Sequence, residues 1–491
     1  MKMRILSMAY LLAGTTCVQA AQASDQPPGD AIASSAYDGF SKDIKQLMER
    51  FEAPSVSVAI IKDGDIVYAE SFGVRTIETN LPATRDTQYP IGSIVKTFTS
   101  GLIGTLEAEG LVDLSAHPAG YLDGLNFDSA ELNSDLTVRS LLSQTSGLPK
   151  IDGSLAFFPA AEQGDLIPRL AQFGETCRVG DCWSYNNLNF ILLDAIAEAV
   201  TGQSKSVLIQ ERLLTPSGMT ASVSNTSSFE RSDLAASGYA KVNGKSRLTA
   251  TEYLYGEQVY ATASDMARWL DVWMQGGAGV IPSDYAKAAM SMQAIVDGKP
   301  PSSDEPGSYL FGYGYGWQVR SMDGHYQVRH GGNENGFSAQ VAFIPASRLG
   351  VVTLTNQQNS ILPYVINDAL TRDLLDLPRP AIEDYPVNVS EAAALISRAD
   401  THFLMNPDAP WSVAPNAMVG RYSAPGYGVI DITFEDGVLS MLTPAADFVL
   451  VHRAGSAFGL ARTTPAPMGI NMDFFEVHFD ANSLTANISD Q

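Results

Sequence analysis

Apolar residues recur every four positions between Pro90 and Gly110, and this spacing predicts a buried helix. The apolar positions are Ile94, Phe98, Leu102 and Leu106. Pro90 and Gly92 precede the pattern and mark the turn from which the helix starts. If the helix begins near Ser93, then Ser93 and Lys96 lie one turn apart on the same face.

The residues around this helix predict an α/β domain whose antiparallel sheet takes strands from both ends of the sequence. A helix over 37–51 comes first, and the hairpin signal Lys62-Asp63-Gly64 then joins two strand-like runs. The pattern is mainly helical from there to about residue 305, after which strands return before a final helix. The expected strands are 56–61, 66–74, 316–321, 326–329, 337–344 and 350–356, and the expected later helices are 187–200, 264–275 and 363–375.

Breaks in these patterns mark the remaining boundaries. Ser264 is the expected cap of helix 264–275, and a linker over 297–307, rich in proline and glycine, ends the helical insert. A linker and a helix, the latter near 391–398, fill residues 377–415. Short alternating strands over 416–491 predict a separate all-β domain, a small barrel or sandwich.

Residues 1–23 have the pattern of a secretory signal peptide. Lys2 and Arg4 precede an apolar run to Ala13, and small residues then offer cleavage sites after Ala20 or Ala23. No later stretch holds 18 uninterrupted apolar residues, so we expect a periplasmic or secreted protein with no stable membrane anchor. The formal net charge of −23 argues against nucleic acid or an anionic membrane as a partner.

Cys177 and Cys182 are the two cysteines that follow the signal peptide, and four residues separate them. In an exported protein we expect them to form a disulfide around a tight turn, with two reduced thiols as the alternative. On the entropic model, closing so short a loop contributes about 2 kcal/mol at most.

Ser93 and Lys96 form the first chemical candidate. A desolvated lysine loses its charge and can accept the proton of a nearby serine, which activates the hydroxyl as a nucleophile. Lys96 is the only lysine with a serine three residues before it. The alternative is an ordinary amphipathic helix whose lysine stem lies along the apolar face.

Tyr185 and Asn187 form the second candidate, on a loop just before the helix expected over 187–200. A tyrosine near a lysine can relay protons, and an asparagine amide can orient both the lysine and a substrate carbonyl. Taken alone, the segment favours a helix N-cap preceded by a packed aromatic residue over a catalytic role.

The third candidate is His330-Gly331-Gly332-Asn333, at the end of a predicted strand. The glycines let a substrate approach the strand edge, and His330 can donate a hydrogen bond or titrate near neutral pH. Taken alone, this is a glycine-rich turn with an incidental histidine.

Ser-x-x-Lys at Ser93, Tyr-x-Asn at Tyr185 and His-x-Gly at His330, in this order, resemble the signature of the penicillin-recognising serine hydrolases. The chain is similar to the class C β-lactamase-like branch, which includes DD-peptidases, D-aminopeptidases and family VIII esterases. The stretches 136–149, 260–268 and 336–339 support the resemblance, which covers about residues 36–376.

The resemblance implies that Ser93 is the acylated nucleophile, Lys96 its base and Tyr185 the residue that passes the proton to the leaving group. The substrate-binding residues that it implies are Asn187, His330, Gly332 and Asn333. The backbone N–H groups of Ser93 and Asn333 would form the oxyanion hole. No metal and no other cofactor is implied.

Two positions depart from the family pattern. Gly331 stands where many carboxylate-binding members have threonine or serine, which weakens the case for penicillin or a free D-Ala carboxylate as substrate. Gln144 replaces the histidine often found before Thr-Ser-Gly, a change for which the sequence offers no mechanistic reading.

These observations predict an exported serine hydrolase that acts through an acyl-enzyme, first of all as a peptidase or amidase on small peptides. A carboxylesterase or β-lactamase of the same family is the alternative. A non-catalytic binding protein that kept the fold is the alternative of another class, and the intact Ser93, Lys96 and Tyr185 argue against it. The six histidines form no His-x-x-x-His and no Cys/His cluster, which disfavours a metalloenzyme.

Overall fold

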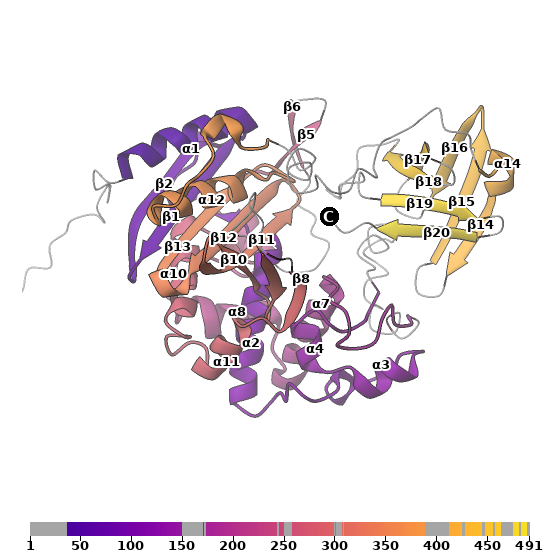
Figure 1. Cartoon of the computed structure of the whole chain (residues 1–491), viewed down its shortest axis with the longest axis horizontal. Helices are drawn as coiled ribbons and strands as arrows, with labels where there is room; N and C mark the ends of the chain where they lie inside the picture. Colours follow the sequence, from indigo (N-terminus) through magenta and orange to yellow (C-terminus); the bar gives the residue numbers. More distant parts are fainter. Residues whose placement is uncertain are drawn as a thin grey trace, which may run out of the picture.

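Figure 1 shows the protein as a computed structural model. The described residues are 37–149, 170, 173–242, 245–249, 258–298, 300, 307, 309–387, 412–424, 428–443, 447–454, 457–462, 475–480 and 483–488. The expected signal peptide over 1–23 and the helix expected near 391–398 lie outside these residues.

β1 (Ser55–Lys62) and β2 (Asp65–Thr76) form the expected hairpin. Asp63 and Gly64 between them have φ angles of 54° and 94°. Positive φ at both central positions is what a type I′ turn requires, and Asp-Gly adopts it readily. The local sequence therefore determines both the turn and the register of this hairpin.

β1 joins the two ends of the domain, because it pairs with β2 on one side and with β13 (Leu349–Thr355) on the other. All pairings in this sheet are antiparallel, and its order is β3-β2-β1-β13-β12-β11-β10-β9-β8. The remaining strands are β3 (Leu81–Pro82), β8 (Ala294–Gly298), β9 (Leu310–Tyr313), β10 (Gln318–Met322), β11 (His325–Glu334) and β12 (Phe337–Ile344). The predicted sheet with strands from both ends is confirmed.

Helices cover both faces of the sheet, and alternate residues of β1 face each layer. Val56, Val58 and Ile60 pack with α1 (Asp38–Phe51) and α12 (Leu362–Leu374). Ala59 and Ile61 point the other way, into the core that contains α10 (Ala263–Met274). Burial on both faces explains why β1 is an almost continuous apolar run.

The helical insert lies between β4 (Tyr89–Pro90) and β8 and is built around α2 (Val95–Ala108) (Figure 1). Most residues of α2 are buried. α2 packs against α7 (Asn187–Thr201), α8 (Lys205–Ile209) and α11 (Ser283–Ala289). The insert also contains α10 and the elements α3 (Ala130–Asp135), α4 (Val138–Leu142), α9 (Thr226–Glu230), β5 (Tyr239–Val242), β6 (Lys245–Leu248) and β7 (Tyr260–Ala261).

The expected cap of α10 at Ser264 is wrong. The cap is Thr262, whose side chain accepts a hydrogen bond from the backbone N–H of Asp265, and Ser264 already lies in the first turn. Thr262 has the extended backbone that an N-cap needs, with ψ at 158°.

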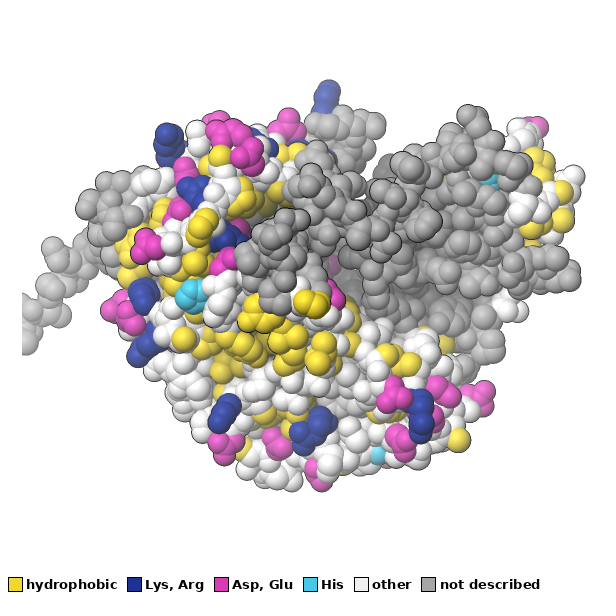
Figure 2. Space-filling view, viewed as in Figure 1, with side chains coloured by type: hydrophobic (Ala, Val, Ile, Leu, Met, Phe, Trp, Pro, Cys, Tyr) yellow, Lys and Arg dark blue, Asp and Glu magenta, His cyan; other side chains and the backbone are white. Residues whose placement is uncertain are grey.

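Several strands were missed in the sequence, and among them β8 and β9 belong to the main sheet. β8 includes Asp297 and Gly298, which were expected in a linker, and β9 covers part of the aromatic run that follows. β8 is an edge strand with mostly exposed side chains, so it carries little apolar signal. Hydrophobic side chains nevertheless gather over this part of the sheet in Figure 2, and Ile295 of β8 is 68% exposed.

The C-terminal strands form a second antiparallel sheet in the order β14-β15-β16-β17-β18-β19-β20. Their bounds are β14 (Gly420–Ala424), β15 (Gly428–Glu435), β16 (Val438–Leu442), β17 (Asp447–Ala454), β18 (Ala457–Arg462), β19 (Phe475–Asp480) and β20 (Ser483–Ile488). Ile432, Met441 and Phe448 belong to its small apolar core. Each strand pairs with its neighbour in sequence, so this region is an up-and-down sheet.

Candidate active site

Ser93 lies in a short 3₁₀ turn, Gly92–Ile94, directly before α2. The structure thus places Ser93 one turn before the α-helix proper, close to the start predicted from the sequence. Gly92 has a φ of 54°, and a Cβ atom there would lie 2.7 Å from the backbone N of Asn333. Glycine is required here because β11 passes directly against the turn that carries Ser93.

Lys96 lies beneath Ser93 and is 4% exposed. Its Nζ donates hydrogen bonds to Ser93 Oγ at 3.2 Å and to Asn187 Oδ1 at 2.5 Å. An unprotonated amine keeps two N–H groups and one lone pair. In that form Lys96 could keep its hydrogen bond to Asn187 and turn its lone pair towards Ser93 Oγ to accept the proton.

Tyr185 lies on the loop before α7, with its ring centroid 5.0 Å from Lys96 Nζ. Its hydroxyl is buried and has no hydrogen-bond partner among the described residues. A buried hydroxyl without a partner is energetically unfavourable unless a ligand or water meets it. The Tyr185 hydroxyl is thus available to a substrate close to Ser93 and Lys96.

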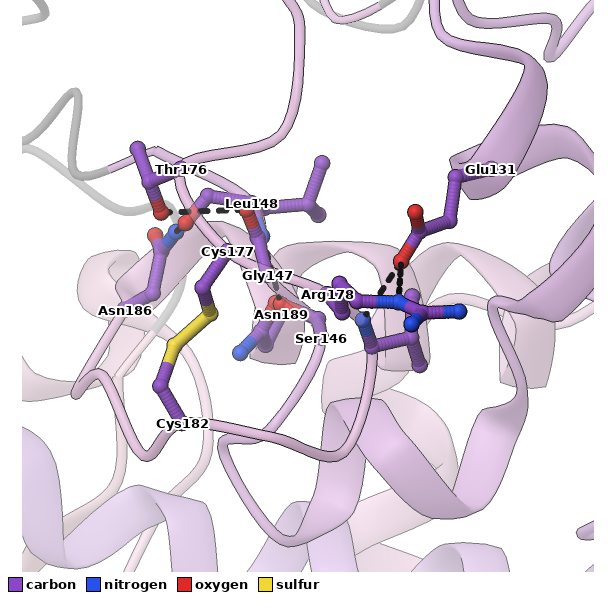
Figure 3. The surroundings of a disulfide bond; sticks show 11 residues. Glu131, Ser146, Gly147, Leu148, Thr176, Cys177, Arg178, Cys182, Asn186 and Asn189 are labelled. Carbon is purple, nitrogen blue, oxygen red and sulfur yellow. Dashed lines mark hydrogen bonds and ion pairs between the residues drawn. A yellow bond between two sulfur atoms is a disulfide. The ribbon is translucent and has the colours of Figure 1, made fainter.

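The disulfide between Cys177 and Cys182 lies on the segment that leads to Tyr185, as predicted (Figure 3). This segment runs along residues 144–149, and Thr176 N donates to Gly147 O at 2.9 Å. Gly147, with a φ of 71°, lets the two backbones meet, since a Cβ there would lie 2.3 Å from Cys177 O. The disulfide and these hydrogen bonds restrict the loop before Tyr185.

Gln144 holds the residues on either side of Tyr185. Its backbone O accepts from Ser184 N at 2.9 Å, and its side-chain Oε1 accepts from Asn186 N at 2.9 Å and Asn189 Nδ2 at 2.6 Å. Gln144 is fully buried. The structure therefore gives this departure from the family pattern a positioning role that the sequence did not reveal.

His330 lies in the middle of β11 rather than at a strand end, because β11 continues through Glu334. Its Nδ1 donates to Gly331 O at 2.7 Å, and its Nε2 accepts from the Tyr313 hydroxyl at 3.3 Å. Burial, and then the charge of Lys96, lower the pKa of His330 to about 3. The expected titration near neutral pH is therefore wrong, and this residue is a neutral imidazole at pH 7.

We expect His330 to make the protein less stable in acid. Its pKa is about 3 when folded against an ordinary value of 6.5, so between these pH values only the unfolded chain takes up the proton. The pKa shift of His330 therefore contributes to the free energy of unfolding fully above pH 6.5. This contribution decreases as the pH falls from 6.5 towards 3. Urea unfolding of the native protein and of His330→Gln between pH 7 and pH 4 measures the difference.

In that series, the pH dependence of the unfolding free energy should be flatter for His330→Gln. The control is His325→Gln, at the start of the same strand, which tests whether any histidine in β11 has this effect. Parallel pH curves for the native protein and His330→Gln would show that His330 takes up its proton equally in both states.

Gly332 and Asn333 bring β11 against the turn that holds Ser93. A Cβ at Gly332 would lie 1.9 Å from Ile91 O, so no larger residue fits. Asn333 N lies beside Gly92, and the Asn333 side chain is held by Ser338 Oγ at 2.8 Å. The two amides expected to form the oxyanion hole thus belong to adjacent backbone segments.

A cavity of about 170 Å³ adjoins Ser93. It is lined by several residues named from the sequence, and by others that the sequence analysis missed. The residues named before are Ser93, Lys96, Asn187 and Asn333; those missed include Thr99, Asp194, Lys205, Gln258 and Glu334. Only Glu334 had a visible signal, because it directly follows the His-Gly-Gly-Asn motif.

Sequence comparison relates the chain to known hydrolases. The model of the Beta-lactamase family matches residues 40–376. Penicillin-binding protein 4 of Amycolatopsis lactamdurans is 26% identical over 71% of this chain and 96% of its own length. A D-aminopeptidase of Brucella anthropi is also 26% identical, over 66% of this chain and 59% of its own.

Solved structures share the fold. The octameric penicillin-binding protein homologue from Pyrococcus abyssi superposes with a TM-score of 0.62 at 21% identity, covering 92% of this chain and 98% of that one. A class C β-lactamase superposes with a TM-score of 0.58 at 21% identity, covering 72% of this chain and 99% of that one. The predicted class C β-lactamase-like fold is confirmed.

Proposed function

Because the protein is a serine hydrolase that belongs to the Beta-lactamase family, we propose that it hydrolyses amide bonds of small peptides through an acyl-enzyme on Ser93. The observation that carries this proposal is the buried Lys96 amine, 3.2 Å from Ser93 Oγ and anchored by Asn187. A non-catalytic role would not require a lysine to be buried beside a serine hydroxyl.

In the first half of the reaction Ser93 Oγ attacks the substrate carbonyl and transfers its proton to Lys96. The oxygen of the tetrahedral intermediate takes up negative charge, which the N–H groups of Ser93 and Asn333 stabilise. Lys96 returns the proton through Tyr185 to the leaving amine, and the C–N bond breaks. Water then attacks the ester carbonyl, and the same groups carry its proton back to Ser93 Oγ.

The leaving-group side of the site favours peptides and amides over penicillins. Many relatives that bind carboxylates carry a hydroxyl at the position of Gly331, and here that position has none. His330 is neutral, with a pKa of about 3, so it supplies no positive charge for a carboxylate. A carboxylesterase remains the second candidate. The alcohol that leaves from a simple ester has no carboxylate, so it needs neither a hydroxyl at position 331 nor a positive charge at position 330.

Gly331→Thr is expected to improve penicillin acylation relative to ester hydrolysis. A hydrogen bond from the new hydroxyl to a carboxylate contributes roughly 1.5–3 kcal/mol, about 10- to 150-fold in affinity. A Cβ at Gly331 would meet Gln340 Oε1 at 3.1 Å, which a small side-chain shift relieves. The measurement is kcat/KM for nitrocefin, p-nitrophenyl butyrate and a D-aminoacyl anilide in both proteins.

Gly331→Val is the matched control, because it has the shape of threonine without the hydroxyl. We expect the native protein to hydrolyse the anilide or the butyrate clearly better than nitrocefin. Fastest turnover of nitrocefin by the native protein would identify a β-lactamase and contradict the proposal.

We also propose that residues 1–23 are removed on export and that the protein works in the periplasm or is secreted. The disulfide supports this, since such bonds persist in oxidising compartments. Among the described residues, no helix has the length and apolar character needed to cross a membrane.

We further propose a catalytic domain over 36–376, a connecting region over 377–415 and a β domain, barrel or sandwich, over 416–491.

A further inference from the structure

The cavity beside Ser93 lies where the acyl part of a substrate must be. In the proposed reaction Tyr185 protonates the leaving group, so the leaving group lies towards Tyr185 and His330. The remaining part of the substrate extends from Ser93 in the other direction. The cavity is lined there by Asn187 and Gln258, and neither Tyr185 nor His330 contributes to it.

Most charged groups of this cavity already have partners. Asp194 receives a hydrogen bond from Lys205 Nζ at 2.6 Å and another from Thr99 Oγ1 at 2.7 Å. Lys96 is bonded to Ser93 and Asn187. These groups need nothing further from a ligand.

Glu334 is the exception. It follows Asn333 at the end of β11, and its one recorded hydrogen bond is a long one of 3.3 Å from Asn335 N to Oε1. Among the described residues no lysine, arginine or histidine forms an ion pair with it. Burial raises the pKa of Glu334 to about 7, although the hydrogen bond from Asn335 N and the charge of Lys96 both act to lower it.

We propose that Glu334 binds a cationic amino group of the substrate, so that the enzyme acts on peptides, amides and esters whose acyl residue has a free α-amine. The proposal rests on the proposed acyl-enzyme at Ser93 and names its substrate class. Glu334 adjoins Asn333, whose amide would bind the substrate oxygen in the proposed oxyanion hole, and an α-amine is two bonds from that carbonyl carbon. The carboxylate and the amine can therefore meet while the carbonyl occupies the oxyanion hole.

The size of the cavity agrees with this substrate class. Pockets for drug-sized ligands measure about 300–1,000 Å³, and this one measures about 170 Å³. It accommodates a single residue rather than an extended peptide on the acyl side. An N-acylated substrate would add bulk and place an uncharged amide against the Glu334 carboxylate, which is unfavourable.

The test compares an alanyl p-nitroanilide that has a free amine with its N-acetyl counterpart, each as the D and the L form. We expect kcat/KM of the native protein to be roughly 10- to 150-fold higher for the free amine, the value of a charge-assisted hydrogen bond. Glu334→Gln, which keeps the shape, should reduce this ratio by a similar factor, mainly through KM. Glu383→Gln, at an exposed glutamate of the short 3₁₀ turn Ile382–Asp384, is the matched control.

Mass measurement after fluorophosphonate treatment separates the two proposals, because that probe reacts with Ser93 whatever the substrate class. No adduct on Ser93 would overturn the proposed function. An adduct together with equal or faster hydrolysis of the N-acetyl substrate by the native protein would overturn the role of Glu334 alone. This second measurement needs no variant, so it holds even if Glu334→Gln fails to fold.

Discussion

Ser93→Ala should lose hydrolysis of every substrate class, with kcat lower by roughly 10⁴- to 10⁶-fold, as when a catalytic nucleophile is removed from other serine hydrolases. The reason is chemical, since no acyl-enzyme can form without the Ser93 hydroxyl. Turnover of p-nitrophenyl butyrate and of aminoacyl anilides measures the loss. Intact mass after fluorophosphonate treatment should show one adduct on the native protein and none on the variant.

Ser134→Ala is a suitable control, because Ser134 is exposed on α3 and its hydroxyl donates only to the backbone of Glu131. Among the described residues, the Ser93 side chain is hydrogen-bonded to Lys96 alone, so the variant should fold and melt normally. Turnover retained by purified Ser93→Ala, with contaminating hydrolases excluded, would contradict the acyl-enzyme mechanism.

Lys96→Ala should be nearly as damaging as Ser93→Ala, because it removes the base that activates the hydroxyl. Tyr185→Phe should lose less, about 10²- to 10⁴-fold, the usual contribution of one acid–base group. Since both residues serve one proton relay, Lys96→Ala/Tyr185→Phe should be little slower than Lys96→Ala. The measurement is kcat/KM for one anilide across the four proteins of this cycle.

Lys96→Ala also leaves Asn187 Oδ1 without its hydrogen bond, which destabilises the fold by about 1–3 kcal/mol. Urea unfolding separates this effect from the kinetic one. Lys45→Ala, on α1, is the control for loss of a lysine far from Ser93. Fully multiplicative losses in the double variant would show that Lys96 and Tyr185 act independently.

The elements predicted correctly are those whose signal is local. The Asp63-Gly64 turn, the apolar spacing of α2 and the loop before α7 each depend on residues close together in the sequence. The motif residues Ser93, Tyr185 and His330 could also be located from the sequence without a structure. The contact of Lys96 with Asn187 was suggested by the chemistry of the asparagine amide, which can orient a lysine, and not by any spacing.

The features that were missed depend on distant partners. Residues 330–334 of β11 carry no apolar alternation, and they are held in strand form by pairing with β12 and by contact with Ile91. Gln144 contacts the loop around Tyr185, and Glu334 lines the cavity beside Ser93, only because the fold brings these segments together. The pKa of His330 was misjudged because its burial is a property of the tertiary structure.

The pairing of β1 with β13 decides when the catalytic domain can form during synthesis. Val56 lies opposite Thr355, so about 300 residues of chain separate the two partners. Until β13 leaves the ribosome, one edge of β1 has no strand to pair with. Until α12 follows, α1 has no α12 to pack against. Contacts this distant in sequence slow folding. The sheet therefore cannot be completed until nearly the whole catalytic domain has been synthesised.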